Sequence, residues 1–107
     1  MNTWFGRIND VNRLRAESGK LYREFLRVPA MSGGLYVLPA GSIDPQRPHR
    51  EDEMYYVIRG RAHFQAGEED KEVSAGSVLF VAAEVQHNFH DIAEELVVLV
   101  FFAPAEG

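Results

Sequence analysis

From residue 20 onward, short apolar runs alternate with Gly, Pro and Asp, a pattern typical of an all-β domain. Asp10 is placed to cap one short helix that ends near Leu14. Short strands joined by tight turns favour a closed or sandwiched antiparallel sheet, either a jelly roll or a small barrel. The pattern predicts seven or eight strands, at residues 20–28, 35–38, 53–59, 61–66, 71–73, 78–81, 88–92 and 95–102.

Two of the predicted strands are apolar on both faces, namely residues 54–58 and 96–102. A single thin barrel buries only one face of each strand, so something must cover the other. Two explanations remain open at this point. Either two copies of the chain pack these outer faces together as a homodimer, or the N-terminal segment, residues 4–28, covers them.

The composition indicates one soluble globular domain. The chain has 107 residues, of which 46% are hydrophobic and 25% are charged. Its net charge is −5 and its eleven Lys and Arg are scattered, so nucleic acid is not an expected partner. It contains no cysteine, so any metal must take nitrogen and oxygen ligands.

The apolar segments are too short for a membrane span or a secretory signal. The longest run, residues 96–103, is far below the roughly 20 residues that a membrane-spanning helix needs. The N-terminus has no continuous apolar stretch after its first residues. We therefore expect no membrane contact and a cytoplasmic location.

A set of possible metal ligands emerges from strand parity. His49 and Glu53 point to the same side of an extended chain, which is also the side of Tyr55 and Val57. A carboxylate among apolar neighbours needs a positive partner, either a divalent cation or an arginine. His87 opens a later strand and would complete a set of two histidines and one carboxylate, which leaves coordination positions open.

The segment from Gly41 to Gly60 resembles the first conserved motif of the cupin family. That motif runs from a glycine through His-x-His and a glutamate to a closing glycine. His49, Glu53 and Gly60 fall on its second histidine, its glutamate and its closing glycine. Arg47 stands where the first histidine is expected, so one ligand of the family pattern is missing.

The segment from Ser74 to Asp91 resembles the second cupin motif. Gly76 and His87 fall on its glycine and its histidine. Ser74 replaces the usual proline, and Asp91 replaces the asparagine that normally stands four residues after the histidine. Together the two motifs place the resemblance over most of residues 35–102.

The resemblance implies a double-stranded β-helix, the jelly-roll barrel of cupins, with a short N-terminal helix. We expect one cupin domain over residues 1–107, with an extension at 1–30 and the barrel at 35–102. It also implies one divalent metal ion, Fe, Mn, Zn or Ni, held by His49, Glu53 and His87. Either Gln46 or water would supply the ligand that Arg47 cannot, because a guanidinium has no acceptor.

Other residues near the site have two possible roles each. Arg47 is expected either to hold a substrate carboxylate or to face solvent, and Tyr55 and Phe89 either to line the pocket or to pack in the core. Tyr55 and Arg47 are thus the candidates for contact with substrate. His90 should face away from His87 and play a structural or supporting part.

Two further groups are expected outside the pocket. His63 is placed like a residue that faces solvent or an interface. The acidic run at residues 68–70 is expected at a solvated hairpin tip.

The resemblance and the candidate ligands are compatible with three classes of function. The first is a metal-dependent enzyme that acts on a small molecule, either by dioxygenase chemistry at Fe(II) or, with zinc, nickel or manganese, as an isomerase, lyase or hydrolase. The second is a non-catalytic module that binds or senses a small ligand. The third is a structural protein with an empty barrel.

Overall fold

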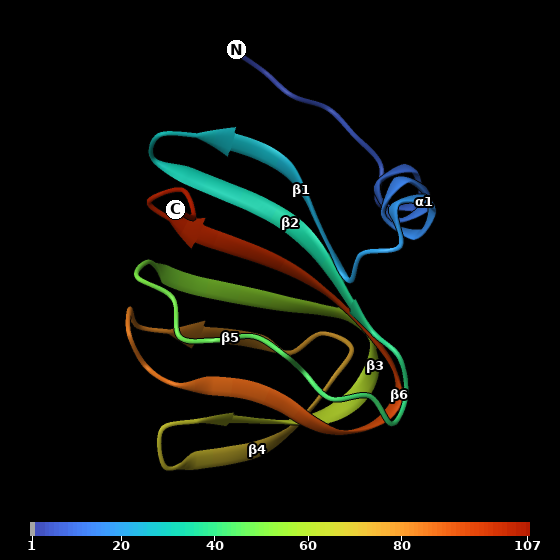
Figure 1. The fold of residues 1–107 in the computed structure, drawn as a ribbon, viewed down its shortest axis with the longest axis vertical. Helices are drawn as coiled ribbons and strands as arrows, with labels where there is room; N and C mark the ends of the chain where they lie inside the picture. Colours follow the sequence, from blue (N-terminus) through green and yellow to red (C-terminus); the bar gives the residue numbers. More distant parts are fainter. Residues whose placement is uncertain (1) are drawn as a thin grey trace.

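The computed structural model describes residues 2–107. Six strands form one antiparallel sheet in the order β1-β2-β6-β3-β4, and β5 pairs with β3 (Figure 1). Within this part of the chain, no helix is long and apolar enough to cross a membrane. The elements are α1 (Ile8–Ser18), β1 (Tyr22–Val28), β2 (Met31–Leu38), β3 (Asp52–Ala66), β4 (Glu69–Ser74), β5 (Val78–Val81) and β6 (His87–Ala103).

The expected jelly roll is confirmed, with fewer and longer strands than the sequence predicts. Residues 53–59 and 61–66 belong to one strand, β3, and residues 88–92 and 95–102 belong to β6. The first half of β3 pairs with β5 and the last part of β6, whereas its second half pairs with β4 and the first part of β6. Both long strands bend, so the sheet folds over on itself around an interior (Figure 1).

The bend in β3 is located at Gly60. The pairing of β3 with β6 is irregular from Val57 to His63, which marks β-bulges. Gly60 has φ +102°, and a Cβ atom there would lie 2.2 Å from the carbonyl oxygen of Glu95. A side chain fits neither the backbone conformation nor the space, which explains why glycine closes the first motif.

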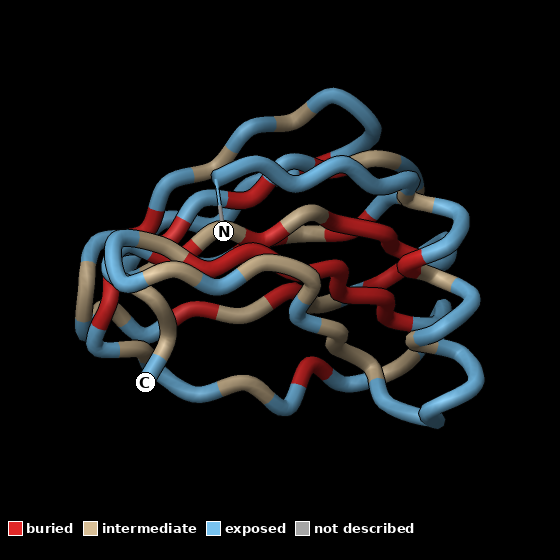
Figure 2. Tube along the Cα trace, turned by 90° about the horizontal axis from the view of Figure 1, so that it is seen from above, coloured by how far each residue is buried: buried red, intermediate tan, exposed pale blue. Residues whose placement is uncertain are grey.

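Side chains along β3 alternate between the interior and the outer face, as strand parity predicts. Glu53, Tyr55 and Val57 are buried, and Met54 and Tyr56 are exposed. Beyond the bend the burial continues at Ala62 and Phe64, in one apolar cluster with residues of the other strands. Figure 2 shows the buried positions gathered along the strands in the middle of the molecule.

Helix α1 packs on the outer face of the sheet, mainly against β1 and β2. Val11 of the helix packs with Leu35, Val37 and Val97 in a second apolar cluster. The helix is longer than predicted, and the expected cap at Asp10 is wrong because Arg7 occupies the N-cap position without a side-chain hydrogen bond. The helix instead forms because its apolar side packs on the sheet.

The N-terminal segment therefore explains part of the two-sided apolar pattern. Val11 of this segment belongs to the same apolar cluster as Val97, against which the partly buried Ile58 and Leu99 also pack. It leaves Met54 and Tyr56 of β3 exposed, together with their cross-strand neighbours Phe80 and Val78 of β5. The homodimer stays a prediction that applies to this remaining patch.

Candidate metal centre

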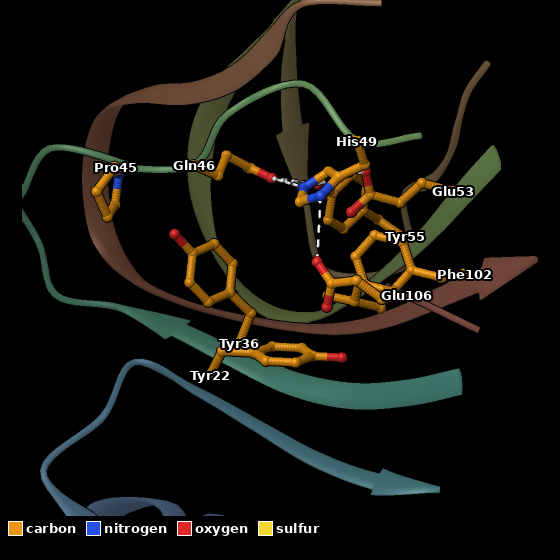
Figure 3. A pocket seen from close by; sticks show the side chains of 10 residues that line it. Tyr22, Tyr36, Pro45, Gln46, His49, Glu53, Tyr55, Phe102 and Glu106 are labelled. Carbon is orange, nitrogen blue, oxygen red and sulfur yellow. Dashed lines mark hydrogen bonds and ion pairs between the residues drawn. The ribbon is translucent and has the colours of Figure 1, made fainter. Parts of the chain in front are cut away.

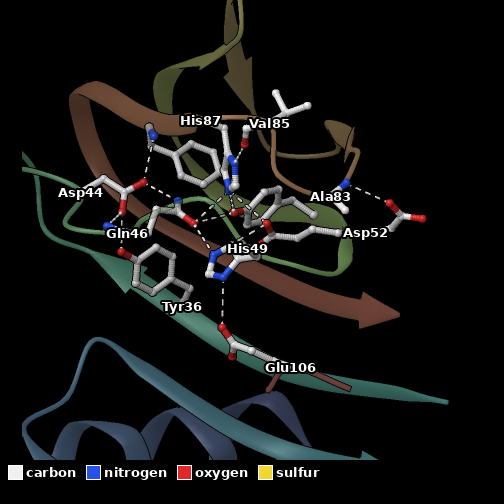
Figure 4. A network of polar contacts seen from close by, with 12 residues as sticks. Tyr36, Asp44, Gln46, His49, Asp52, Ala83, Val85, His87 and Glu106 are labelled. Carbon is white, nitrogen blue, oxygen red and sulfur yellow. Dashed lines mark hydrogen bonds and ion pairs between the residues drawn. The ribbon is translucent and has the colours of Figure 1, made fainter. Parts of the chain in front are cut away.

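The interior of the barrel brings together the three residues that strand parity and the motifs single out. His49 lies on the loop before β3, Glu53 on β3 and His87 at the start of β6 (Figures 3 and 4). One potential ligand atom from each lies within 4.8 Å of the others. The side chains of Glu53 and His87 are 2% and 1% exposed.

The side chains of Glu53 and His87 meet in the interior through two atoms that can both only accept a hydrogen bond when His87 is neutral. His87 Nδ1 donates to the backbone carbonyl of Val85 at 2.8 Å, which leaves Nε2 as an acceptor when the ring is neutral. This Nε2 lies 2.9 Å from Glu53 Oε1. Among residues 2–107, that oxygen has no hydrogen-bond partner of acceptable geometry. The Tyr55 hydroxyl also lies 3.1 Å from His87 Nε2. Two acceptors thus face each other in a buried place, and a cation or a proton between them would satisfy both.

The pKa of His87 reflects this competition. Burial lowers the pKa, but contact with the Glu53 carboxylate and the hydrogen bond to Val85 outweigh burial, so the pKa is raised above its ordinary value. Without a metal ion, a proton on Nε2 resolves the repulsion. A divalent cation would replace that proton.

Gln46 adds a fourth donor atom, an amide oxygen, at the same point. Its Oε1 lies 3.2 Å from His87 Nε2 and 3.4 Å from His49 Nε2, and it accepts a hydrogen bond from the Tyr55 hydroxyl at 2.9 Å. The segment before Pro48 has no regular secondary structure, and hydrogen bonds to Asp44 hold the Gln46 side chain inward. Figure 4 shows the Gln46 amide directed toward the two imidazole rings.

Asp44 sets the orientation of the Gln46 amide. Its carboxylate is buried and accepts hydrogen bonds from Gln46 Nε2 at 2.5 Å and Gln46 N at 3.2 Å. The same carboxylate accepts from the Tyr36 hydroxyl at 2.5 Å and from Phe89 N at 2.9 Å. Because the amide nitrogen donates to Asp44, the amide oxygen must face the histidines.

Glu106 plays a corresponding part for His49. Its Oε2 lies 3.2 Å from His49 Nδ1, so the carboxylate accepts the Nδ1 proton and Nε2 keeps its lone pair toward the centre (Figure 3). The backbone places Glu106 there through a hydrogen bond from its N–H to Ser32 Oγ at 2.9 Å and one from the Arg27 side chain to its carbonyl. Burial chiefly raises the pKa of Glu106, and proximity to His49 lowers it only in part.

A cavity of about 180 Å³ opens beside these groups. It is smaller than the roughly 300–1,000 Å³ that drug-sized ligands occupy, so it admits only a small molecule. Tyr22 of β1 extends into it, and within the described chain the buried Tyr22 hydroxyl has no hydrogen-bond partner. The lining residues are Tyr22, Tyr36, Pro45, Gln46, His49, Glu53, Tyr55, Val100, Phe102 and Glu106 (Figure 3).

The other predicted residues fall in different places. Tyr55 lines the cavity, whereas Phe89 is fully buried in the apolar core against the Tyr55 ring. Arg47 is exposed and does not line the cavity. His63 and His90 lie on the outer face of the sheet, as their parity predicts.

Three residues of the site are absent from the sequence analysis, namely Tyr22, Asp44 and Glu106. Tyr22 and Glu106 lie outside the two motifs, and only the folded chain brings them to the centre. Asp44 lies inside the first motif, two residues before Gln46. Its spacing to Gln46 was a usable signal, since an Asp often accepts from a backbone N–H two residues on.

The donor set fits a divalent metal ion. Two imidazole nitrogens, one carboxylate oxygen and one amide oxygen are ligands that iron, manganese, zinc and nickel accept. The orphaned Glu53 Oε1 is the atom that such an ion would satisfy. Both histidines also have the outer hydrogen bond that orients metal-bound imidazoles.

Comparison with known proteins agrees with the fold and the motifs. The family model described as Cupin_2, cupin domain, matches residues 34–102. Uncharacterized protein SCO3923 of Streptomyces coelicolor is 47% identical over 101 residues, which cover 94% of this chain and 96% of that protein.

Two solved structures illustrate the fold. TT1209 from Thermus thermophilus superposes with a TM-score of 0.75 at 23% identity and covers 96% of this chain and 99% of that one. KdgF from Halomonas sp. has a TM-score of 0.70 at 17% identity, with 78% of this chain and 76% of that one covered. At these identities the two structures support the fold alone.

Proposed function

This chain belongs to the cupin family, and we propose that it is a metal-dependent enzyme that acts on a small molecule inside its barrel. The observation that carries the proposal is Glu53 Oε1, a buried carboxylate oxygen without a hydrogen-bond partner among residues 2–107, 2.9 Å from His87 Nε2. Removing a carboxylate from water is costly unless a cation compensates for it. The proposed ligands are Gln46, His49, Glu53 and His87.

The bound ion would act as a Lewis acid that polarises an oxygen of the small molecule or activates a bound water or oxygen molecule. The set of two histidines and one carboxylate makes Fe(II) and dioxygenase chemistry the first reaction class to test. With zinc, nickel or manganese, the same ligands suit an isomerase, a lyase or a hydrolase. The metal found in the protein narrows this choice.

Tyr22 supplies a recognition group for the small molecule. Burial, together with the nearby carboxylates of Glu106, Glu24 and Glu53, raises the pKa of Tyr22, so the hydroxyl keeps its proton. A protonated hydroxyl without a protein acceptor can donate to an oxygen of the ligand. The preferred ligand is therefore compact, with at least one acceptor oxygen and an apolar part that fits against Phe102 and Val100.

A second candidate is a module that binds a small ligand without catalysis. The observation that favours it is that both buried tyrosine hydroxyls already have protein partners, Asp44 for Tyr36 and both Gln46 and His87 for Tyr55. Neither tyrosine is then free to exchange a proton with a ligand. Arg47 is exposed and does not line the cavity, so its expected contact with a substrate carboxylate stays a prediction.

The decisive experiment is elemental analysis of metal in the freshly purified chain, in His87→Ala and in the matched variant Gln86→Ala. Gln86 is the exposed neighbour of His87 and does not line the cavity. We expect one equivalent of metal to disappear in His87→Ala and to remain in Gln86→Ala. Glu53→Gln, which keeps the volume and removes the charge, should bind the same metal at least about tenfold more weakly. Equal metal content in all four proteins would refute the proposal.

A further inference from the structure

A second group of metal-ligating side chains lies on the outer face of the sheet, on the opposite side from the cavity. His63 comes from β3, Asp70 from β4 and His90 from β6. One nitrogen or oxygen atom from each lies within 4.8 Å of the others. We propose that these three residues form a second binding site for a divalent transition-metal ion, independent of the interior centre.

The register of the sheet builds this group. His63 and His90 are directly opposite each other in the β3–β6 pairing, and their ring centroids are 5.4 Å apart. Asp70 pairs with Gln65, two residues along from His63, so it projects from the same face. Three adjacent strands, rather than a loop, thus hold the donor atoms.

The carboxylate of Asp70 lies between the two rings. His90 Nε2 is 2.9 Å from Asp70 Oδ1 and 2.8 Å from Oδ2, and His63 Nδ1 is 3.7 Å from Oδ1. On its other side, His90 Nδ1 lies 3.0 Å from Asp91 Oδ2. A carboxylate can only accept there, so Asp91 fixes the proton on Nδ1 and leaves Nε2 as the nitrogen that meets the ion.

Hydrogen bonds within this group leave one donor atom without a partner. A His90 ring protonated on both nitrogens, whose pKa the contacts with Asp70 and Asp91 raise, can donate to both carboxylates. His63 Nδ1, at 3.7 Å from Asp70 Oδ1, is too far away for a hydrogen bond. A single divalent ion would satisfy all three side chains. The acidic surroundings, with Glu72 opposite His63 and Asp91 beside His90, favour a cation further.

The site is open to ions from solution. The side chains of His63, Asp70 and His90 are 43%, 39% and 29% exposed. Two imidazoles and one carboxylate suit Zn²⁺, Ni²⁺ or Cu²⁺, and three protein donors leave a position for water or an external ligand. Because β4 is an edge strand that pairs with β3 alone, an ion here would also tie β4 to β6 (Figure 1).

The test is calorimetric titration with Zn²⁺ of a chain that carries His49→Ala and His87→Ala, so that the interior centre does not contribute. We expect one equivalent bound, at least about tenfold weaker after His63→Ala, Asp70→Asn or His90→Ala. Glu69→Gln is the matched control, because Glu69 is an exposed acid of β4 that pairs with Lys71. We also expect Zn²⁺ to slow amide exchange in β4.

A second measurement keeps the test independent of how that double variant folds. In the intact chain, NMR should show Zn²⁺ shifting the imidazole signals of His63 and His90, and the shifts should vanish in Asp70→Asn. No Zn²⁺ uptake would overturn the proposal. Uptake that Glu69→Gln weakens as much as Asp70→Asn would overturn it too, since that result would mean non-specific attraction to an acidic surface. Neither result bears on whether the interior centre binds a metal ion.

Discussion

The amide nitrogen of Gln46 donates to Asp44 Oδ2 at 2.5 Å, and this hydrogen bond turns the amide oxygen of Gln46 toward the two histidines of the interior centre. Gln46 is one residue before the position where the cupin pattern has its first histidine. The residue directly before Arg47 thus supplies an amide oxygen near the place of the missing imidazole nitrogen. An amide oxygen is neutral and weaker as a ligand than an imidazole, so its orientation has to be held by a partner.

Asp44→Asn should weaken metal binding at the interior centre by about tenfold or more. An asparagine has one acceptor oxygen in place of a carboxylate with two, so it cannot serve all the donors that Asp44 serves. The unpaired donors should also lower the free energy of unfolding by about 1–3 kcal/mol. Metal titration and urea unfolding measure the two effects. Asp52→Asn is the control, because Asp52 is exposed and accepts only from Ala83 N in this structure, at 2.9 Å.

Gln46→Ala separates the two possibilities for the fourth ligand. If Gln46 binds the ion, the variant should lose affinity and X-ray absorption should show a changed set of ligands. Unchanged affinity and an unchanged spectrum would assign the fourth position to water.

Glu106→Gln should lower metal affinity by roughly tenfold and leave the fold intact. The variant keeps an acceptor for His49 Nδ1 but removes the negative charge that strengthens the imidazole as a ligand. The backbone hydrogen bond from Glu106 to Ser32 is retained. Glu24→Gln serves as control, since Glu24 is an exposed carboxylate paired with Arg27. Equal affinities in the two variants would argue against a role for Glu106.

Gly34→Ala should force Tyr22 out of the cavity. A Cβ atom at Gly34 would lie 2.2 Å from the Tyr22 hydroxyl, whereas at Gly33 the nearest atom is Phe101 Cδ1 at 3.2 Å. We expect Gly34→Ala to cost about 1–3 kcal/mol of unfolding free energy and Gly33→Ala to cost less. A crystal structure of each variant checks the position of the Tyr22 ring. An unmoved ring in Gly34→Ala would contradict the expectation.

The exposed patch on β3 and β5 is the predicted homodimer surface. Met54 and Phe80 are cross-strand neighbours with exposed fractions of 45% and 63%, and Tyr56 and Val78 follow with 43% and 61%. If two chains pack there, Phe80→Asp should convert a dimer to a monomer in sedimentation velocity. Phe5→Asp is the control, because Phe5 is 89% exposed in the N-terminal segment. A monomeric unmodified chain would refute the homodimer.

Gly60→Ala should lower the free energy of unfolding by about 3 kcal/mol, because strain at positive φ and a backbone clash add together. Gly67 separates the two causes. Its φ is also positive, at +58°, but nothing lies within 4 Å of a Cβ atom placed there. We expect Gly67→Ala to cost about 1 kcal/mol. Urea unfolding measures both variants, and equal losses would show that the close approach to Glu95 is unimportant.

The sequence by itself determined the fold class, the inward side of β3 and the group formed by His49, Glu53 and His87. Strand parity is a local property that survives folding, because side chains alternate along every strand, as Glu53, Tyr55 and Val57 do on β3. The inclusion of His49, which lies on a loop, and of the distant His87 came from the spacing of the two cupin motifs. Strand parity also placed His90 and His63 on the outer face correctly. It did not reveal their convergence on Asp70, since that depends on the register between three strands.

Only the tertiary structure decided the rest. The continuity of β3 and β6 through their bends depends on pairing between distant residues, which the turn signals at Gly60 and around residue 93 conceal. Tyr22 and Glu106 reach the centre because β1 pairs with β2 and the last residues dock beside Ser32. Contacts between residues so far apart in the chain leave no periodic trace in the sequence, because their distance is set by the packing of the whole sheet.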